Sequence, residues 1–380
     1  MPVKKTAPVA AELSWSDVHA FRLERHHLTT RAPKSQLAQV VGDIGGAQAQ
    51  VMSFAELQIA IRVDCTPEDI RDALWKRKTL AKTWLMRGTL HLARSTDLPI
   101  YTGALGAYTL RNVNAWLKYL KLTEPQMNNL FQRIGDALNG TPVTREELIG
   151  VVGRGQTAHV RQILKSGWSG LLKPAARQGS LCFGPNRGQS VTFVSPRSWL
   201  NEWRELDPEA ANAEMARRYL RAYGPATRKD YSRWMGMFPG ADRAAWSAVE
   251  EELVNVSVEG QAAQMLAADL KSMRSSEVGN ESVQLLPGFD PYLMGHATRD
   301  HLFDAVHRWK VSRVAGWISP VVLVDGRVLG VWSHAVTKGN LRVAITPFSS
   351  LKPRVIKALG PRAETIAKAL GVTLDRVTFD

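Results

Sequence analysis

Two glutamines, Gln48 and Gln50, stand one residue apart in the run GGAQAQ at 45–50. In an extended segment their side chains point to the same side of the chain, whereas in a helix they would diverge by roughly 200 degrees. The preceding glycines and a helix start expected at Ser53 favour the extended conformation. Two amides on one side offer donors and acceptors together, so they can hold a water molecule and stabilise a developing positive charge without titrating.

The same pair of glutamines also has a purely structural interpretation. Their amides can satisfy the backbone at the start of the following helix or simply face solvent, and neither role needs a ligand. An amide is not a strong general base, so any reaction at this pair has to proceed without one. The residues by themselves leave both interpretations open.

A second polar set lies in the run TWLMRGTLHL at 83–92. If this run is one strand, Arg87, Thr89 and His91 share its outward face while apolar residues share the other. The three side chains are then expected to line a cavity or to touch phosphate. For His91 three roles stay open: general acid or base, phosphate ligand, or structural histidine held by hydrogen bonds.

The charge balance indicates an anionic partner. The 380 residues include 49 Lys and Arg against 35 Asp and Glu, a formal net charge of +14. Such an excess attracts a polyanion and makes binding strongly salt-dependent, so nucleic acid is the first partner to consider. Surplus arginine can also lie on solvated faces without a partner.

Several basic residues are candidates for phosphate contact. Those of the segment 217–233 are Arg217, Arg218, Arg221, Arg228, Lys229 and Arg233. Lys338 lies at a turn that is expected to be a hairpin tip. Five tryptophans are expected in the core instead of on a binding surface, namely Trp84, Trp234, Trp246, Trp317 and Trp332.

Neither a metal nor a cofactor is expected. Cys65 and Cys182 lie far apart and in no metal-ligand spacing, and no acidic cluster has the spacing of a metal site. A nuclease or other metal-dependent chemistry therefore ranks last. No apolar run approaches the roughly 20 residues that cross a bilayer, and the first residues lack a signal-peptide core. We expect a protein of the reducing cytoplasm that acts away from membranes.

Helix and strand signals around both polar sets predict a winged helix. Ser53 begins a capping box, and Thr66 followed by Pro67 opens a second helix that runs to about Lys78. The extended run 83–92 follows. Two helices and a β-ribbon place the second helix in a DNA major groove and the ribbon along the backbone.

The same order of signals recurs twice. In the second winged-helix module the helix and strand signals lie at 124–138, 144–147, 167–178, 181–183 and 191–194. In the third they lie at 208–223, 227–230, 241–251, 253–258 and 262–266. A β-rich end follows, with a hairpin around Asp325 and Gly326, a helix over about 353–370 and a last strand.

The expected fold class is α+β, with three tandem winged-helix modules followed by a small C-terminal β-barrel-like domain. The expected division is a flexible arm at 1–10, winged helices at 11–118, 119–205 and 206–270, and a C-terminal domain with a terminal helix at 271–380. No heptad or other dimer element is visible, so we expect a monomer on one duplex.

Three groups of residues resemble the AlkZ/YcaQ winged-helix DNA glycosylases. They are GAQAQ (46–50) with RGTLH (87–91), YLRAYGPAT (219–227) with Trp234, and LPGFDPY (286–292). The resemblance implies three winged helices and a β-barrel around a basic DNA channel. It also implies monofunctional hydrolysis of the N-glycosidic bond of alkylated purines, including bulky or cross-linked N7 adducts.

The catalytic tripeptide of that family is Gln-apolar-Gln in the AlkZ type and Gln-apolar-Asp in the YcaQ type. Residues 48–50 match the first, which implies that Gln48 and Gln50 position the attacking water and the scissile sugar. An N7-alkylated purine is already a cationic leaving group, so the barrier lies in stabilising an oxocarbenium-like state and amides can suffice. Asp290 in LPGFDPY is expected to cap a turn and not to react.

A second function of a different class is a non-catalytic DNA-binding regulator. Winged helices are commoner in transcription factors than in glycosylases, so the fold alone does not decide between the two. A regulator usually dimerises on a palindrome, whereas three modules within one chain favour a monomer. The enzyme is therefore the preferred hypothesis.

Overall fold

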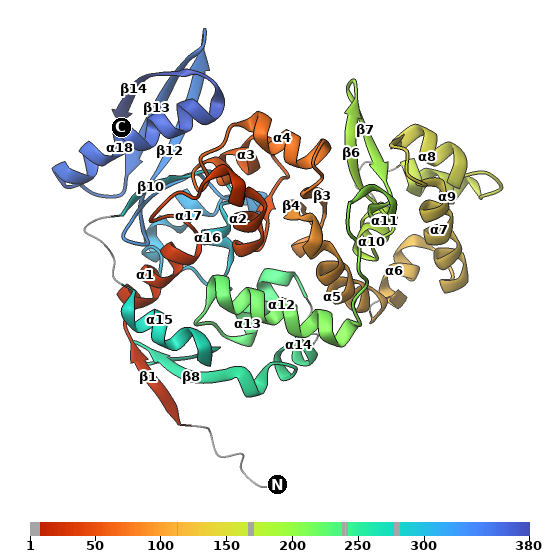
Figure 1. Cartoon of the computed structure of the whole chain (residues 1–380), viewed down its shortest axis with the longest axis horizontal. Coiled ribbons are helices and arrows are strands. Elements are labelled where there is room, and N and C mark those ends of the chain that lie inside the picture. The colour runs from red at the N-terminus through yellow and green to blue at the C-terminus, as the bar shows by residue number, and fades with distance from the viewer. Residues whose placement is uncertain (1–7, 112, 166–170, 238–239, 241, 277–281) are drawn as a thin grey trace. The chain divides into compact units, whose positions relative to one another are not determined.

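The computed structural model describes residues 8–111, 113–165, 171–237, 240, 242–276 and 282–380 (Figure 1). They form a mixed α+β fold of two compact units. The first unit comprises Met1–Ile70 with Ala216–Asp380, and the second comprises Arg71–Met215. The chain passes between the units within α4 (Pro67–Trp75) and α12 (Pro208–Tyr223).

The first unit contains helices of very different lengths, from the single turn of α16 to the 18 residues of α18. They are α1 (Trp15–Arg25), α2 (Leu37–Asp43), α3 (Met52–Ala60), α13 (Arg228–Met235), α14 (Arg243–Ser247), α15 (Leu270–Ser275), α16 (Pro291–Met294), α17 (Arg308–Val311) and α18 (Pro353–Leu370). Two predicted starts are confirmed, because Thr66 and Thr227 accept hydrogen bonds from backbone amides of the first turn. The start predicted at Ser53 is wrong: α3 begins at Met52 after Val51, which makes no side-chain cap.

A five-stranded sheet forms the C-terminal part of the first unit, in the order β10-β11-β12-β13-β14. Its strands are β10 (Val283–Leu286), β11 (Val321–Val324), β12 (Arg327–Thr337), β13 (Asn340–Pro347) and β14 (Thr373–Phe379). All pairs are antiparallel except β13 with β14. The predicted turn is confirmed, with Asp325 and Gly326 both at positive φ. The helix predicted over about 353–370 is confirmed as α18, which buries Val355, Leu359 and Ile366 in the core of this part.

A three-stranded sheet pairs the first described residues with two strands from much later in the chain. It has the order β1-β8-β9, formed by β1 (Val9–Leu13), β8 (Leu253–Val258) and β9 (Gln261–Leu266). Strand β1 begins inside the segment that was expected to be a loose arm, and residues 1–7 lie outside the described part. The partner of β1 is more than two hundred residues away, so no local signal reveals the pairing.

The second unit has its own helices and two small sets of strands. They are α5 (Leu98–Arg111), α6 (Val113–Leu120), α7 (Glu124–Ala137), α8 (Arg145–Val152), α9 (Ala158–Lys165), α10 (Leu172–Arg177), α11 (Pro196–Trp199), β3 (Leu80–Trp84), β4 (Leu90–Arg94), β5 (Val143–Thr144), β6 (Cys182–Arg187) and β7 (Ser190–Val194). The capping box at Thr144 and the β6–β7 hairpin are confirmed. Part of the helix predicted over 167–178 lies outside the described residues, and the rest is α10.

The single strand predicted over 83–92 is wrong. The chain forms the antiparallel pair β3 and β4 instead, with Trp84 opposite Leu90. Arg87 and Gly88 lie between the strands at φ 56° and φ 66°, in the left-handed region that turns the chain sharply. Arg87, Thr89 and His91 therefore do not share the face of one strand.

Candidate active site

Two glycines place Gln48 in a short strand. Helix α2 ends at Asp43, and Gly45 and Gly46 follow at φ 70° and φ 92°. The amide of Gly46 donates to the carbonyl of Val41 at 2.9 Å, which closes the end of the helix. The reversed chain then enters β2 (Ala47–Gln48), so the predicted extended conformation is confirmed for these two residues.

The turn at Gly45 packs against aromatic residues of α12 and α13. A Cβ at Gly45 would lie 2.9 Å from the indole of Trp234 and 3.7 Å from the ring of Tyr223. The hydroxyl of Tyr223 donates to the carbonyl of Ile44 at 2.9 Å. The run 219–227 and Trp234 thus lie directly against the turn that leads into Gln48.

We expect Gly45→Ala to destabilise the protein by about 3 kcal/mol. An alanine is strained at positive φ, and its Cβ would also clash with the indole of Trp234, which can move away only at a further cost in free energy. Gly371→Ala is the matched control, since Gly371 is at φ 68° with no atom within 4 Å of its added Cβ. It should cost about 1 kcal/mol from the backbone alone. Equal losses in chemical denaturation would show that the Trp234 contact does not constrain the turn.

Gln48 and Gln50 differ in exposure. Gln48 is 6% exposed, whereas Gln50 lies at the surface in a bend after the end of β2. Solvent therefore reaches the side chain of Gln50, whereas that of Gln48 is packed inside the protein. The two glutamine side chains therefore lie in different environments and are not equivalent.

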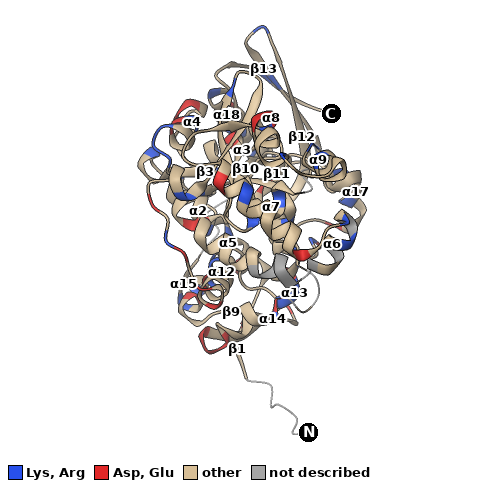
Figure 2. Cartoon of the chain, turned by 90° about the vertical axis from the view of Figure 1, so that its right-hand side faces the viewer, with Lys and Arg blue, Asp and Glu red and all other residues tan. Residues whose placement is uncertain are grey.

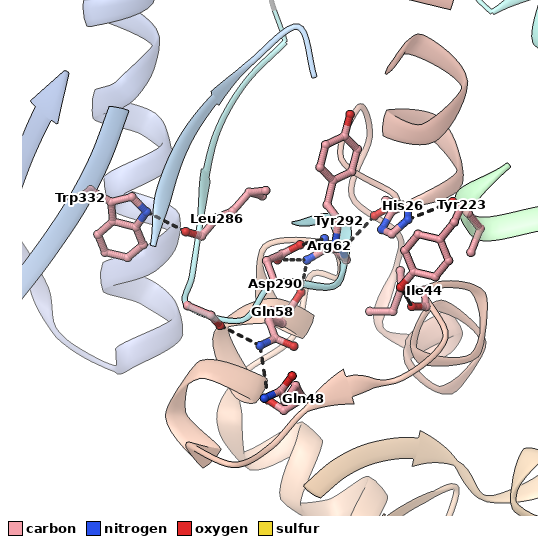
Figure 3. A network of polar contacts seen from close by, with 12 residues as sticks. His26, Ile44, Gln48, Gln58, Arg62, Tyr223, Leu286, Asp290, Tyr292 and Trp332 are labelled. Carbon is pink, nitrogen blue, oxygen red and sulfur yellow. Dashed lines mark hydrogen bonds and ion pairs between the residues drawn. The ribbon is translucent and has the colours of Figure 1, made fainter. Parts of the chain in front are cut away.

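Gln58 of α3 holds the backbone of the motif. Its side chain is fully buried, and its Nε2 donates to the carbonyl oxygens of Gln48 at 3.4 Å and Gly288 at 3.0 Å (Figure 3). A Cβ at Gly288 would lie 2.5 Å from the ring of Phe54, so only glycine fits there. Through Gln58, the run 286–292 is joined to the strand that carries Gln48.

A buried ion pair lies behind Gln58. Arg62 donates to both carboxylate oxygens of Asp290 at 2.8 Å and 2.7 Å, and neither side chain is exposed. Arg62 also donates to the carbonyls of Gln58 at 2.8 Å and His26 at 2.9 Å. Such a bidentate pair is stable in a low-dielectric interior only because each partner satisfies the other.

Asp290 also has the role predicted for it, since it accepts from the amide of Tyr292 at 3.0 Å and caps α16. His26 continues the network to α12, where its ring nitrogen Nε2 contacts the carbonyl of Ala222 at 3.1 Å. Burial, and then the charge of Arg62, hold the pKa of His26 well below its usual range, so the ring is neutral. The network joins the runs 45–50, 219–227 and 286–292.

Sequence reasoning missed Gln58, Arg62 and His26. The available signal was the placement of Gln58 and Arg62 four residues apart in the otherwise largely apolar run FAELQIAIR (54–62). Polar side chains on an apolar helix face are buried only when partners exist for them. The partners themselves were not readable, because they come from distant segments.

His91 has the environment of a structural histidine. Its side chain is buried, and its Nδ1 lies 3.0 Å from the carbonyl of Thr89. Burial, and to a lesser extent Arg87, lower the pKa of His91 to about 3. A neutral imidazole at physiological pH neither pairs with phosphate as a cation nor takes up a proton readily, which leaves the structural role as the best supported of the three.

The low pKa of His91 predicts a pH dependence of stability. Between pH 6.5 and about 3 the unfolded chain binds a proton at this position and the folded chain does not, so acid favours unfolding across this window. Lowering the pH from 7 to 5 should therefore cost the wild type about 2 kcal/mol more than His91→Gln, which retains a donor but does not titrate. Guanidinium unfolding at both pH values tests this. Equal losses in the two proteins would contradict the burial of His91.

The basic candidates of the first unit are not all equally available. Arg221, Lys229 and Arg233 are exposed, whereas Arg228 pairs with the carboxylate of Asp242 at 2.7 Å. Lys338 is exposed at the tip between β12 and β13, at φ 50°. Figure 2 shows lysines and arginines spread over many elements, with aspartates and glutamates among them.

Two further properties of the described residues bear on function. No group of three or more His, Cys, Asp or Glu within them is placed to hold a metal ion. None of the helices that the structure describes combines the length and apolar character needed to cross a membrane.

Comparisons with known proteins identify the family. The model of the "DNA glycosylase AlkZ-like" family matches residues 41–371. The interstrand DNA cross-link repair glycosylase of Streptomyces sahachiroi is 36% identical over 372 residues, which cover 95% of this chain and 97% of that protein. The solved structure of the DNA glycosylase AlkZ of Streptomyces sahachiroi matches with a TM-score of 0.86 and 34% identity, covering 97% of this chain and all of the other. The chain therefore belongs to the AlkZ-like family of DNA glycosylases.

Proposed function

We propose that this DNA glycosylase hydrolyses the N-glycosidic bond of N7-alkylated purines, including bulky adducts and interstrand cross-links, as a monofunctional enzyme without metal or cofactor. The cross-link substrate follows the name of the Streptomyces sahachiroi relative. The observation that carries the assignment of the site is the buried network that fixes the backbone of Gln48 beside the exposed Gln50.

In the proposed reaction the bond between C1′ and the purine nitrogen breaks, and its electron pair neutralises the cationic base. Gln48 is nearly buried, so its amide dipole acts in a low dielectric and stabilises the oxocarbenium-like sugar. Gln50 is exposed and orients a water molecule. The water oxygen bonds to C1′ and its proton passes to solvent.

The proposed DNA contacts extend over both units. They comprise Arg87, Thr89, His91, Arg221, Arg228, Lys229, Arg233 and Lys338. The exposed members contact phosphate directly, whereas His91 is buried and positions the backbone at Thr89, whose carbonyl its Nδ1 contacts. Arg228 has to exchange Asp242 for phosphate.

We further propose that winged helices occupy 11–118, 119–205 and 206–270, followed by a β-rich domain at 271–380. The support is the helix-and-hairpin order within each segment: β3–β4, β6–β7 and β8–β9 each follow a set of helices. The enzyme is proposed to act as a cytoplasmic monomer on double-stranded DNA.

The test is incubation with duplexes that carry N7-alkylguanines of increasing size, followed by cleavage of abasic sites. Release of the base with strand cleavage only after the second step is expected for a monofunctional enzyme. The alternative is a non-catalytic DNA-binding regulator, which the winged-helix order also accommodates. DNA affinity without cleavage on any adduct would contradict the proposed reaction and favour the regulator.

A further inference from the structure

A pocket of about 490 Å³ opens beside α17 in the first unit. Three indoles line it: Trp309, Trp317 and Trp332. Trp332 is buried in its floor, with Nε1 donating to the carbonyl of Leu286 at 2.8 Å. Trp309 is 70% exposed at the rim and Trp317 is 38% exposed, so the prediction that Trp317 belongs to the core is wrong. Two exposed indoles on one pocket are costly in water unless something covers them.

The pocket is electrostatically suited to an anion. Lys310 and Arg313 line it, and no aspartate or glutamate among the described residues does. In the part of the chain that the structure describes, neither cation takes part in an ion pair, and the ammonium of Lys310 lies 5.5 Å from the Trp309 ring. Burial lowers the pKa of His334, which also lines the pocket, so it adds no charge near neutral pH.

A second pocket of the same unit shows that this charge pattern is not general. It has a similar volume of about 440 Å³ and is lined by four acids, Asp230, Glu259, Asp300 and Asp304, together with one cation, Arg327, which pairs with Asp304 at 3.0 Å. The two pockets of this unit therefore differ in charge: among the described residues, acids outnumber cations in one, whereas the other is lined by cations without an acid. Charge complementarity therefore selects a phosphate-bearing ligand for the pocket at α17.

The rim of the α17 pocket is pre-formed. The amide of Arg313 donates to the carbonyl of Trp317 at 2.8 Å, and the amide of Trp317 donates to Val314 at 3.3 Å. This short loop turns through Ala315 at φ 56°, a conformation that a residue other than glycine rarely adopts. These backbone hydrogen bonds place the Cα atoms of Arg313 and Trp317, from which the two side chains start, at the base of one loop.

The pocket shares its supports with the glutamine motif. Phe54 lines the pocket from α3, the helix whose Gln58 donates to the carbonyl of Gln48. Phe289 follows Gly288, the other acceptor of Gln58, and packs edge-on against Trp317 with ring centroids 5.0 Å apart. A ligand in the pocket would therefore be anchored to the same helix and turn that fix Gln48.

We infer that this pocket binds one unstacked nucleotide of the DNA, with its base against the indoles of Trp309 and Trp317 and its phosphate on Arg313 and Lys310. Aromatic faces stack any base, and neighbouring cations hold the strand without reading its sequence. The volume lies within the range of ligand pockets. The inference rests on the proposed action on DNA and adds a site for an unpaired nucleotide to it.

The test uses undamaged DNA and so does not depend on base release. A fluorescent single-stranded 12-nucleotide oligothymidine is titrated with the full chain at fixed salt, beside a blunt duplex. Trp309→Ala and Arg313→Ala should each weaken single-strand binding about tenfold and duplex binding less than about twofold. Trp309→Phe should restore most of the affinity. Phe379→Ala and Lys357→Ala, at exposed positions outside the pocket, are the matched controls.

A covalent probe locates the base. An oligothymidine with one 5-iododeoxyuridine is irradiated on the wild type, and the cross-linked peptide is expected to contain Trp309 or Trp317. Unchanged single-strand affinity, equal losses on the duplex, or cross-links only elsewhere would each overturn the inference. Gln48→Ala should bind the oligothymidine normally, so failure of the proposed catalysis and failure of this pocket give different results.

Discussion

Gln48→Ala and Gln50→Ala are each expected to slow release of N7-methylguanine from alkylated DNA by about 100-fold or more, as loss of one preorganised dipole does in other enzymes. DNA affinity should change little, because the amides act on the reacting sugar and water and not on the phosphates. The measurement is single-turnover base release beside binding of the same duplex. Gln36→Ala, an exposed glutamine outside the motif, is the control.

The two glutamines should respond differently to conservative changes. Gln50→Asp keeps an acceptor for water at the exposed position, and the family pattern Gln-apolar-Asp allows it, so partial activity is expected. Gln48→Leu keeps the volume of the buried side chain but removes its dipole, and should be as inactive as Gln48→Ala. Undiminished release by either alanine variant would remove that residue from the mechanism.

Asp290→Ala is expected to lower the free energy of unfolding by about 3 to 5 kcal/mol, because it leaves the guanidinium of Arg62 buried without its partner. The pair of Arg308 with Asp300 is a matched control, with a similar contact of 2.8 Å but both side chains 61% exposed. Asp300→Ala should cost less than about 1 kcal/mol. Chemical denaturation of both variants makes the comparison.

A double variant separates charge from packing. Replacing Arg62 by methionine and Asp290 by leucine removes both charges and should recover much of the loss, since no buried charge is left unpaired. Base release by the double variant should still be slower than that of the wild type. Arg62 donates to the carbonyl of Gln58, and the side chain of Gln58 in turn donates to the carbonyl of Gln48. If Asp290→Ala proved no more costly than Asp300→Ala, the buried pair would not stabilise the fold.

Local signals predicted the elements that depend on neighbours in the chain. The starts at Thr66, Thr144 and Thr227 were correct because a capping box is closed by residues three positions apart. Helix α18 was correct from Pro353 to Leu370 because its buried side chains recur on one face. Strand β1 and the break at Arg87 were not predicted, because they depend on pairing partners and on a left-handed turn at a residue other than glycine.

The sequence by itself determined the motif Gln48-Ala49-Gln50, its extended entry, the excess of positive charge and the family, since these depend on residue types and short spacings. Only the tertiary structure decided that Gln58 lies beneath Gln48, that Arg62 meets an acid 228 positions away, and that Trp317 is exposed. Burial and pairing are set by segments far apart in the chain, so the same polar residue can be read as solvated or as part of the core until its neighbours are known.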